Sequence, residues 1–461
     1  MSLIIRNVGA AARLDEHLAL DALAAHLTPT LLAQTVAACQ VQEQRVRKLP
    51  ATVVLAFCIA MNLFASDALG AVFRRFVHGL RWVWPETAPL RVSKGALSLA
   101  RYRLGARPLV ALFHQVCRPL ATPQTPGAFA FGYRHLALDT QTVDLPDTPE
   151  NDRAFGRPST DRGVAAWPQA RLVGLVECGT HAYLDAGLWP YRADQHAGAR
   201  RLLRAVGRGD LLSYDCGLHS YALLAAARAR GAHVLARLPA GARPTILRIL
   251  ADGTVLARID PTTGPRRAAR GILVRLMRYT LDDPVLPHHG EEHRLITTLL
   301  NPRRAPAEEV VFAYHNRWEY ELSADEIETH QRPRTPLRSH KPVGVVQEVY
   351  GLLIAHYLVR VVMVQAAQTV DLPPTRLSFL ETLRILRDYL PDFQQADPSE
   401  HPRLHRALVE EILAVKLPPR AQRINPRVVK QKMVSFPVKR AYHRAWPKPT
   451  KPFRNAIVLL N

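Results

Sequence analysis

The sequence predicts an α/β fold with a helical N-terminal region. Residues 13–125 are rich in Ala, Leu and Arg with helical periodicity, whereas from residue 126 the pattern changes to short runs typical of β-strands. Hydrophobic residues make up 48% of the 461 positions. That content is ample for packed cores, and the length suits about two to four domains.

The apolar and cysteine patterns indicate a protein that does not enter a membrane. The most apolar run, residues 49–65, is short for a bilayer span and predicts a buried helix. No signal-peptide pattern precedes Asp15. The five cysteines lie far apart without a Cys-x2-Cys pair, so neither a zinc site nor a disulfide framework is expected. We expect a cytoplasmic location.

Residues 126–238 predict the first part of an α/β core. The expected elements are strands at 135–145, 171–180 and 182–188, a helix at 194–206, a strand at 211–215, a helix at 220–230 and a strand at 233–238. Three strands followed by alternating helix and strand is the order of an RNase H-like core. In that order the first and fourth strands lie side by side, so Asp139 and Asp215 should approach one another.

The two aspartates are the first candidate site residues. Each belongs to an apolar run, where an unpaired carboxylate is costly. Two carboxylates placed together repel and raise one pKa unless a divalent cation compensates, so the pair predicts a metal site. A strand-end cap or a salt bridge is the alternative role for Asp139, and Asp144 and Asp147 are competing carboxylates nearby.

A second candidate group follows in the segment FAYHNRWEYELSADEIETHQR. Tyr314, Arg317 and Glu321 are spaced i, i+3 and i+7, which predicts one helix face at 3.6 residues per turn. The acid could hold a cation while the guanidinium and the phenol bind phosphate oxygens. An ordinary amphipathic helix with ion pairs is the alternative.

Between these groups, residues 239–292 predict a β-rich insertion. Asp252-Gly253 separates two alternating runs and predicts a two-residue hairpin turn. A further strand is expected at 271–280, and helical runs apolar enough to cover a sheet are expected at 343–395.

The charge pattern indicates a polyanionic partner. The 61 Lys and Arg against 39 Asp and Glu give a net charge of +22, which favours nucleic acid. No acidic residue follows Glu411, and prolines interrupt this basic stretch, so it predicts an arm; a solvated tail without a specific role is the alternative. Candidate DNA contacts there are Arg427, Lys430, Lys432, Lys439 and Arg440.

Together the three acidic segments resemble the DDE transposases of the insertion-sequence-four family. LALDTQTVDLPDT matches the first strand and its Leu-Pro-Asp-Thr run, Asp215-Cys216-Gly217 matches Asp-x-Gly, and Tyr314, Arg317 and Glu321 match Tyr-x2-Arg-x3-Glu. RKLPATVVLAF near Arg47 is similar to the N-terminal domain of that family. The resemblance spans nearly the whole chain.

The resemblance implies a cut-and-paste transposase. Asp139, Asp215 and Glu321 would hold two Mg2+ ions, with Mn2+ as a substitute, for cleavage at the element ends and joining of the 3′-hydroxyl to target DNA. Implied partners are double-stranded DNA, at the terminal inverted repeats and the target, and a second copy in a homodimer, with a hairpin intermediate and no membrane; the site of action would be the bacterial nucleoid. The implied domains are end recognition at 13–125, the core at 126–238 and 293–400, the insertion at 239–292, and the basic arm at 401–461.

Two positions depart from the family pattern. Thr140 stands where Gly is usual, and Glu328 stands where Lys is usual. Glu328 either weakens end binding by repelling phosphate, or a neighbouring basic residue such as Arg332 or Arg334 takes over the phosphate contact. These departures keep open a catalytically impaired, transposase-derived repressor as the alternative, and a nuclease or resolvase-like protein that cuts without strand transfer is the alternative among enzymes.

Overall fold

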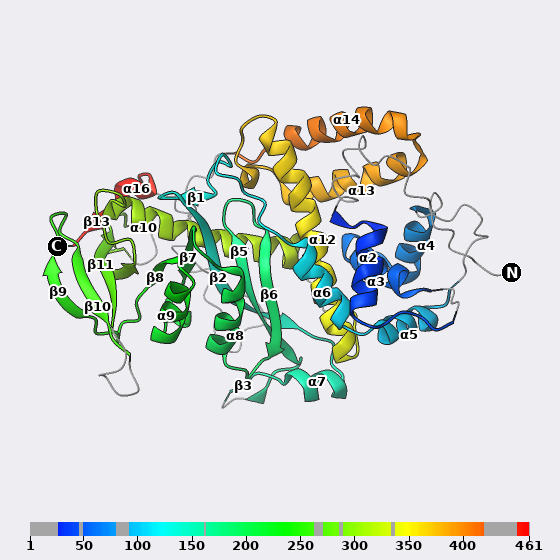
Figure 1. Cartoon of the computed structure of the whole chain (residues 1–461), viewed down its shortest axis with the longest axis horizontal. Helices are drawn as coiled ribbons and strands as arrows, with labels where there is room; N and C mark the ends of the chain where they lie inside the picture. Colours follow the sequence, from blue (N-terminus) through cyan, green and yellow to red (C-terminus); the bar gives the residue numbers. More distant parts are fainter. Residues whose placement is uncertain are drawn as a thin grey trace. The chain divides into compact units, whose positions relative to one another are not determined.

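The computed structural model forms two compact units, each assembled from three separate stretches of the chain (Figure 1). Unit 1 comprises Met1–Ala128, Thr140–Gly198 and Glu319–Lys416, and unit 2 comprises Phe129–Asp139, Ala199–Trp318 and Leu417–Asn461. The residues that the structure describes are 26–45, 49–79, 92–160, 163–261, 271–284, 289–332, 337–418 and 450–460. The predicted domain ranges stay predictions, because neither unit follows one linear range.

The N-terminal part of unit 1 is helical, as the sequence predicts. Its helices are α2 (Pro29–Ala38), α3 (Ala51–Leu63), α4 (Leu69–Gly79), α5 (Lys94–Leu104) and α6 (Arg107–Val116). Thr28 and Ser93 cap α2 and α5, each accepting a hydrogen bond from a backbone N–H of the first turn. Helix α3 is buried along most of its length, which confirms the buried helix predicted at 49–65.

Helix α12 (Pro342–Gln368) is the central element of unit 1. It packs against α3 and α6, and also against α13 (Phe379–Gln395) and α14 (His401–Ala414). By length and composition α12 could cross a membrane, but 94% of its most apolar window is buried inside the structure. A helix buried on all sides needs apolar residues all round, so this pattern is that of a core helix.

The strands of unit 1 form a hairpin. Strands β5 (Gln169–Glu177) and β6 (Tyr183–Pro190) pair antiparallel. Before them the chain forms α7 (Pro149–Phe155) and the short pair β3 (Ser159–Thr160) and β4 (Gly163–Val164). Tyr350 of α12 donates a hydrogen bond to the carbonyl of Ala186 at 3.0 Å, which ties the hairpin to the central helix.

Unit 2 is built on a mixed sheet. β2 (Tyr133–Asp144) enters unit 1 after Asp139, and its earlier residues pair parallel with β7 (Asp210–Tyr214), which pairs parallel with β8 (His233–Arg237). Antiparallel strands follow in the order β12 (His293–Thr297), β11 (Ile272–Leu281), β10 (Val255–Ile259) and β9 (Thr245–Ile249). The short β1 (Phe129–Ala130) pairs with β2. This order confirms that the predicted first and fourth long strands are neighbours.

Helices complete unit 2. They are α8 (Gln195–Leu202), which begins in unit 1, α9 (Tyr221–Ala229) and α10 (Ala307–His315). Apolar side chains of α10, including Val310 and Val311, share a buried cluster with Leu235 of β8 and Leu295 of β12. This packing positions the end of α10, where two candidate site residues lie.

The hairpin predicted at Asp252-Gly253 is present, but its turn differs. The backbone N–H of Gly253 donates to the carbonyl of Leu250 at 3.0 Å, and Gly253 has a φ of 78°. The backbone N–H of Leu250 donates to the carbonyl of Thr254 at 2.7 Å. The turn is therefore closed over Leu250–Gly253 with a glycine bulge after it, rather than by two residues.

Both ends of the stretch predicted as an arm, 401–461, form secondary structure. Residues 401–414 form α14 in unit 1, and the chain end forms α16 (Phe453–Ala456) and β13 (Ile457–Leu459) in unit 2. β13 pairs antiparallel with β11, and the Phe453 ring stacks on His315 with centroids 4.2 Å apart. Apolar residues here override the basic composition. Residues 419–449, which carry the five candidate DNA contacts of the arm, lie outside the described residues.

The docking of the chain end generates a stability prediction. Phe453→Ala should lower the free energy of unfolding by about 3–5 kcal/mol, because Phe453 is 6% exposed within the core of unit 2. The measurement is denaturant unfolding of the full chain. Val458→Ala is the control: Val458 is 41% exposed in the same segment, and its loss should cost less than about 1 kcal/mol. Equal effects would mean that the segment does not dock as described.

Candidate active site

Two aspartates lie where the parallel pairing of β2 with β7 ends. The register pairs Arg134 with Asp210 and continues to Leu138 with Tyr214; Asp139 is the next residue of β2, and Asp215 directly follows the last residue of β7. The preceding apolar residues are fully buried. The carboxylates therefore appear where two buried runs stop side by side, as the sequence predicts for these strands.

Side chains from the α10 region donate hydrogen bonds to both carboxylates. Arg317 Nη1 donates to Asp139 Oδ2 at 2.7 Å, and the Tyr314 hydroxyl donates to Asp215 Oδ1 at 3.1 Å. The backbone N–H of Cys216 donates to the same Asp215 oxygen at 2.7 Å. The Arg317 guanidinium also lies 5.8 Å from the centre of the Tyr314 ring. One short segment thus supplies a cation and a phenol to the acidic pair.

These donors keep Asp215 ionised. Burial alone would raise the pKa of Asp215, but the Cys216 N–H, the Arg317 charge and the Tyr314 hydroxyl together hold that pKa below its ordinary value. Burial raises the pKa of Tyr314 far above its ordinary value, so the phenol remains a donor. The result is an ionised Asp215 with Asp139 and a guanidinium beside it.

The donor chemistry of this pair fits a divalent cation. Ionised carboxylate oxygens are the ligands that Mg2+ and Mn2+ prefer, and an adjoining pair favours a positive ion to offset its repulsion. Within the described parts of the chain, no three His, Cys, Asp or Glu side chains are grouped as a metal site. Asp139 and Asp215 would therefore supply only part of a ligand set.

The helix predicted through Tyr314, Arg317 and Glu321 is interrupted. Tyr314 lies in α10, Arg317 in a 3-10 turn (Asn316–Trp318) and Glu321 in the following helix, α11 (Glu319–Asp325), which continues into a π-helical turn (Glu326–Gln331). A 3-10 turn has 3.0 residues per turn, so it changes the phase counted at 3.6, and the single face through all three residues stays a prediction. Glu321 belongs to unit 1, and its convergence with the aspartates of unit 2 stays a prediction.

Unit 1 contains a polar cavity beside the residues that follow Asp139 on β2. Its volume is 370 Å³, and its lining residues are Thr140, Gln141, Thr142, Arg171, Gln195 and Glu328. Arg171 Nη1 donates to Gln195 Oε1 at 3.3 Å within this lining. Both departures from the family pattern, Thr140 and Glu328, therefore lie in one cavity wall.

Glu328 has a cationic neighbour. Burial raises the pKa of Glu328, the charge of Arg332 opposes that rise, and Asp144 adds to it. Burial in turn lowers the pKa of Arg332, and Glu348 and Glu328 oppose that change. Arg332 is thus close enough to influence the charge of Glu328, while its takeover of a phosphate contact stays a prediction and Arg334 lies outside the described residues.

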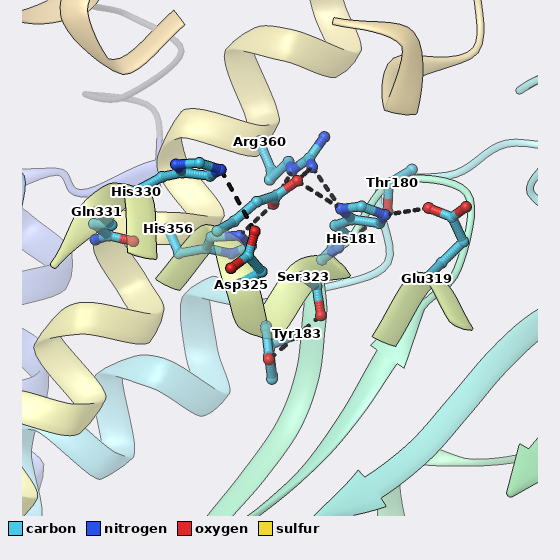
Figure 2. A network of polar contacts seen from close by, with 12 residues as sticks. Thr180, His181, Tyr183, Glu319, Ser323, Asp325, His330, Gln331, His356 and Arg360 are labelled. Carbon is cyan, nitrogen blue, oxygen red and sulfur yellow. Dashed lines mark hydrogen bonds and ion pairs between the residues drawn. The ribbon is translucent and has the colours of Figure 1, made fainter. Parts of the chain in front are cut away.

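Sequence reasoning missed a buried polar network in unit 1 (Figure 2). Glu326 accepts hydrogen bonds from Arg360 Nε at 3.0 Å and from His356 Nε2 at 2.9 Å, and its other oxygen lies 2.8 Å from His181 Nδ1. The only local signal is the i, i+4 pair of His356 and Arg360 inside an apolar helix. No spacing rule connects that pair to His181.

Comparisons with known proteins match most of the chain. Residues 17–114 match the family described as insertion element 4 transposase N-terminal, and residues 130–358 match the transposase DDE domain. The chain is 31% identical over 447 residues to "Transposase InsG for insertion sequence element IS4" of Escherichia coli K12, covering 95% of this chain and 96% of the relative.

Two further similarities are partial or remote. Over 150 residues the chain is 28% identical to the "Putative transposase InsZ" of Escherichia coli K12, covering 32% of this chain and 50% of that protein. A piggyBac transposase in a cryo-EM structure of a synaptic complex with hairpin DNA aligns with a TM-score of 0.40 and 11% identity, covering 87% of this chain and 85% of that one.

The pairing of Glu328 with Arg332 generates a second prediction. Glu328→Lys should lower the free energy of unfolding by about 1 kcal/mol more than Glu328→Gln, because the lysine would stand beside a partly buried arginine. Denaturant unfolding of both variants measures this. In an Arg332→Gln background the difference should vanish. Equal stabilities with Arg332 present would remove Arg332 as the partner and favour the repelled-phosphate explanation of Glu328.

Proposed function

The chain belongs to the IS4 family of DDE transposases, and we propose that it binds the terminal inverted repeats of an insertion sequence, cuts DNA at the element ends and joins the freed 3′-hydroxyl to target DNA. The observation that carries the proposal is the pair Asp139 and Asp215, which directly follow the last paired residues of β2 and β7, with Arg317 and Tyr314 hydrogen-bonded to them. The mixed sheet and its flanking helices are consistent with an RNase H-like core.

Three carboxylates of this chain would hold the metal ions. Asp139 of β2 and Asp215, directly after β7, would supply carboxylate oxygens, and Glu321 of α11 would supply the third ligand. Two bound Mg2+ ions, or Mn2+ in their place, would supply activation of a water and then of the 3′-hydroxyl, and stabilise the charge of the phosphate under attack. A single site would serve both cleavage and joining.

Arg317 and Tyr314 would bind and orient the phosphate. Arg317 is 8% exposed and hydrogen-bonds Asp139, so it is held beside the carboxylates in one position. With a cation held by the aspartates, the guanidinium would be available to fork onto phosphate oxygens. The Tyr314 hydroxyl, which stays protonated, would donate to a further oxygen.

The chain charge supports a DNA partner. The net charge of +22 favours binding to the phosphate backbone, and the basic residues after Glu411 add contacts that carry no sequence information. We further propose that a homodimer pairs two element ends in the synaptic complex and that the protein acts in the cytoplasm on the bacterial nucleoid.

A second function rests on Glu328 and Thr140. Both residues lie in the wall of the polar cavity, where the family pattern has lysine and glycine. If they prevent cleavage, the protein would act as a repressor that occupies the ends of its own element. The intact pair of Asp139 and Asp215 favours the enzyme.

The main test removes one proposed metal ligand at a time. Asp139→Asn, Asp215→Asn and Glu321→Gln should each reduce cleavage of an end-containing duplex at least about 100-fold. Loss of a residue that only hydrogen-bonds to a metal ligand already lowers metal affinity or activity about 10- to 100-fold. End binding in a gel-shift assay should persist. Asp144→Asn is the matched control: it is an exposed carboxylate on the same strand and should leave cleavage unchanged. Full cleavage by any of the three variants would exclude that residue as a ligand, and an inactive wild type that binds its ends would favour the repressor.

A separate test addresses the basic segment. Replacing Arg427, Lys430, Lys432, Lys439 and Arg440 by glutamine should weaken binding to all duplexes and reduce the log-log salt slope by about 0.9 for each phosphate that the protein then leaves unneutralised. All five substitutions leave Phe453, Ala456 and Ile457 of the buried cluster in unit 2 unchanged. Arg384→Gln is the control, because Arg384 is exposed and paired with Glu381. An unchanged slope in the five-residue variant would show that this segment does not contact DNA.

A further inference from the structure

His181 occupies an unusual place in unit 1. It lies in the connection between β5 and β6, its side chain is fully buried, and its φ is 60°, in the left-handed region. A residue other than glycine is uncommon there and costs on the order of 1–3 kcal/mol. The turn holds it by a hydrogen bond from the His181 N–H to the carbonyl of Glu177 at 2.8 Å.

Both ring nitrogens of His181 face acidic side chains of one chain segment. Nε2 lies 2.6 Å from Glu319 Oε2, and Nδ1 lies 2.8 Å from Glu326 Oε1 and 2.5 Å from Arg360 Nη2. A ring protonated at Nε2 donates to Glu319 in either case. Nδ1 then either donates to Glu326 or accepts from Arg360, which itself binds Glu326 (Figure 2).

The two glutamates mark the two ends of α11. Glu319 is the first residue of that helix, and Glu326 directly follows its last residue, Asp325. Both side chains reach the same imidazole ring, so they project from the same side of this segment. One imidazole therefore contacts α11 at its beginning and at its end.

Glu321 lies on the other side of the same helix. It is two residues after Glu319, and at about 100° per residue its side chain projects about 200° around the axis from the His181 side. A helix attached at a single point can still rotate, whereas two attachment points on one side fix both its rotation and its position along its axis. The direction of Glu321 is then set by contacts on the opposite face.

The attachment is anchored to the rigid centre of unit 1. Glu326 accepts hydrogen bonds from His356 and Arg360, both on the buried helix α12. Burial would raise the pKa of Glu326, but the charges of Arg360 and His181 and the hydrogen bonds from His181 and His356 hold it well below its ordinary value. Glu326 therefore stays charged. We call the contacts of His181 with Glu319 and Glu326 the brace; through them α11 is connected to the β5–β6 turn and to α12, the longest described helix of the unit.

We propose that His181, through Glu319 and Glu326, is a positioning residue that sets the direction of the Glu321 carboxylate for metal binding. The proposal rests on the proposed function, because it takes Glu321 as a metal ligand. A network that served stability alone would not need to contact both ends of the short helix that carries Glu321.

The test uses variants of the full chain that retain the fold. Glu319→Ala removes one end of the brace at a side chain that is 21% exposed, and His181→Asn keeps a residue type that tolerates positive φ. Glu319→Gln keeps an oxygen that can accept from Nε2 and serves as the conservative rescue. Glu381→Ala is the matched control: Glu381 is also a first-turn glutamate paired at 2.6 Å with a basic side chain, but on α13.

Two readouts separate positioning from stability. Mn2+ binding to the complex of the protein with end DNA, followed by electron paramagnetic resonance, should weaken about 10- to 100-fold in Glu319→Ala and His181→Asn. The single-turnover cleavage rate should fall in the same range, while affinity for end DNA stays within about threefold. Glu319→Gln should recover most of both losses, and Glu381→Ala should match the wild type.

The outcomes distinguish this proposal from the function on which it rests. Unchanged Mn2+ binding and cleavage in both brace variants, with an active wild type that requires Glu321, would overturn the role of His181 alone. A Glu319→Gln variant as impaired as Glu319→Ala would also overturn it. Cleavage that does not require Glu321 would instead overturn the assignment of that residue as a ligand.

Discussion

The parallel pairing of β2 with β7 places two carboxylates side by side, and the candidate site depends on how that charge is compensated. Asp139 and Asp215 follow buried apolar runs, so water alone does not offset their repulsion. Arg317 and Tyr314 provide the compensation in this structure. Tyr314 lies near the end of α10, and Arg317 lies in the 3-10 turn that follows it. Apolar side chains of α10 are buried in the core of unit 2, so the packing of this helix holds both donors near the aspartates.

The candidate residues lie close to the points where the chain passes between its two compact units. Asp139 is the last residue of the first stretch of unit 2. Arg317 comes one residue before Trp318, where the second stretch of unit 2 ends, and Glu321 is the third residue of the stretch of unit 1 that follows. Such a chain path brings together residues distant in sequence, which delays their contacts during folding. Unit 1 also depends on a contact between residues distant in sequence, because His181 joins α11 to a turn about 140 positions earlier in the chain.

Much of this architecture follows from local patterns. The strands of the core were predictable because alternating or continuous apolar runs end at polar turns, and both aspartates were predictable because a charge inside such a run is costly. The break after Arg317 was not predictable, since a 3-10 turn and a π turn depend on what the flanking residues contact. The docked chain end was missed because Phe453 and Ile457 are few among many basic residues, and the His181 network has no spacing signal at all.

The central claim is that Asp139, Asp215 and Glu321 form one metal site when element-end DNA is bound. The most direct measurement is a crystal structure of that complex with Mn2+, in which anomalous scattering locates the ions. The account predicts an anomalous peak coordinated by Asp139 and Asp215, with a carboxylate oxygen of Glu321 completing a pair of sites about 4 Å apart. It would be contradicted by a complex in which any two of the three carboxyl groups lie more than about 10 Å apart, since they could not then share such a pair.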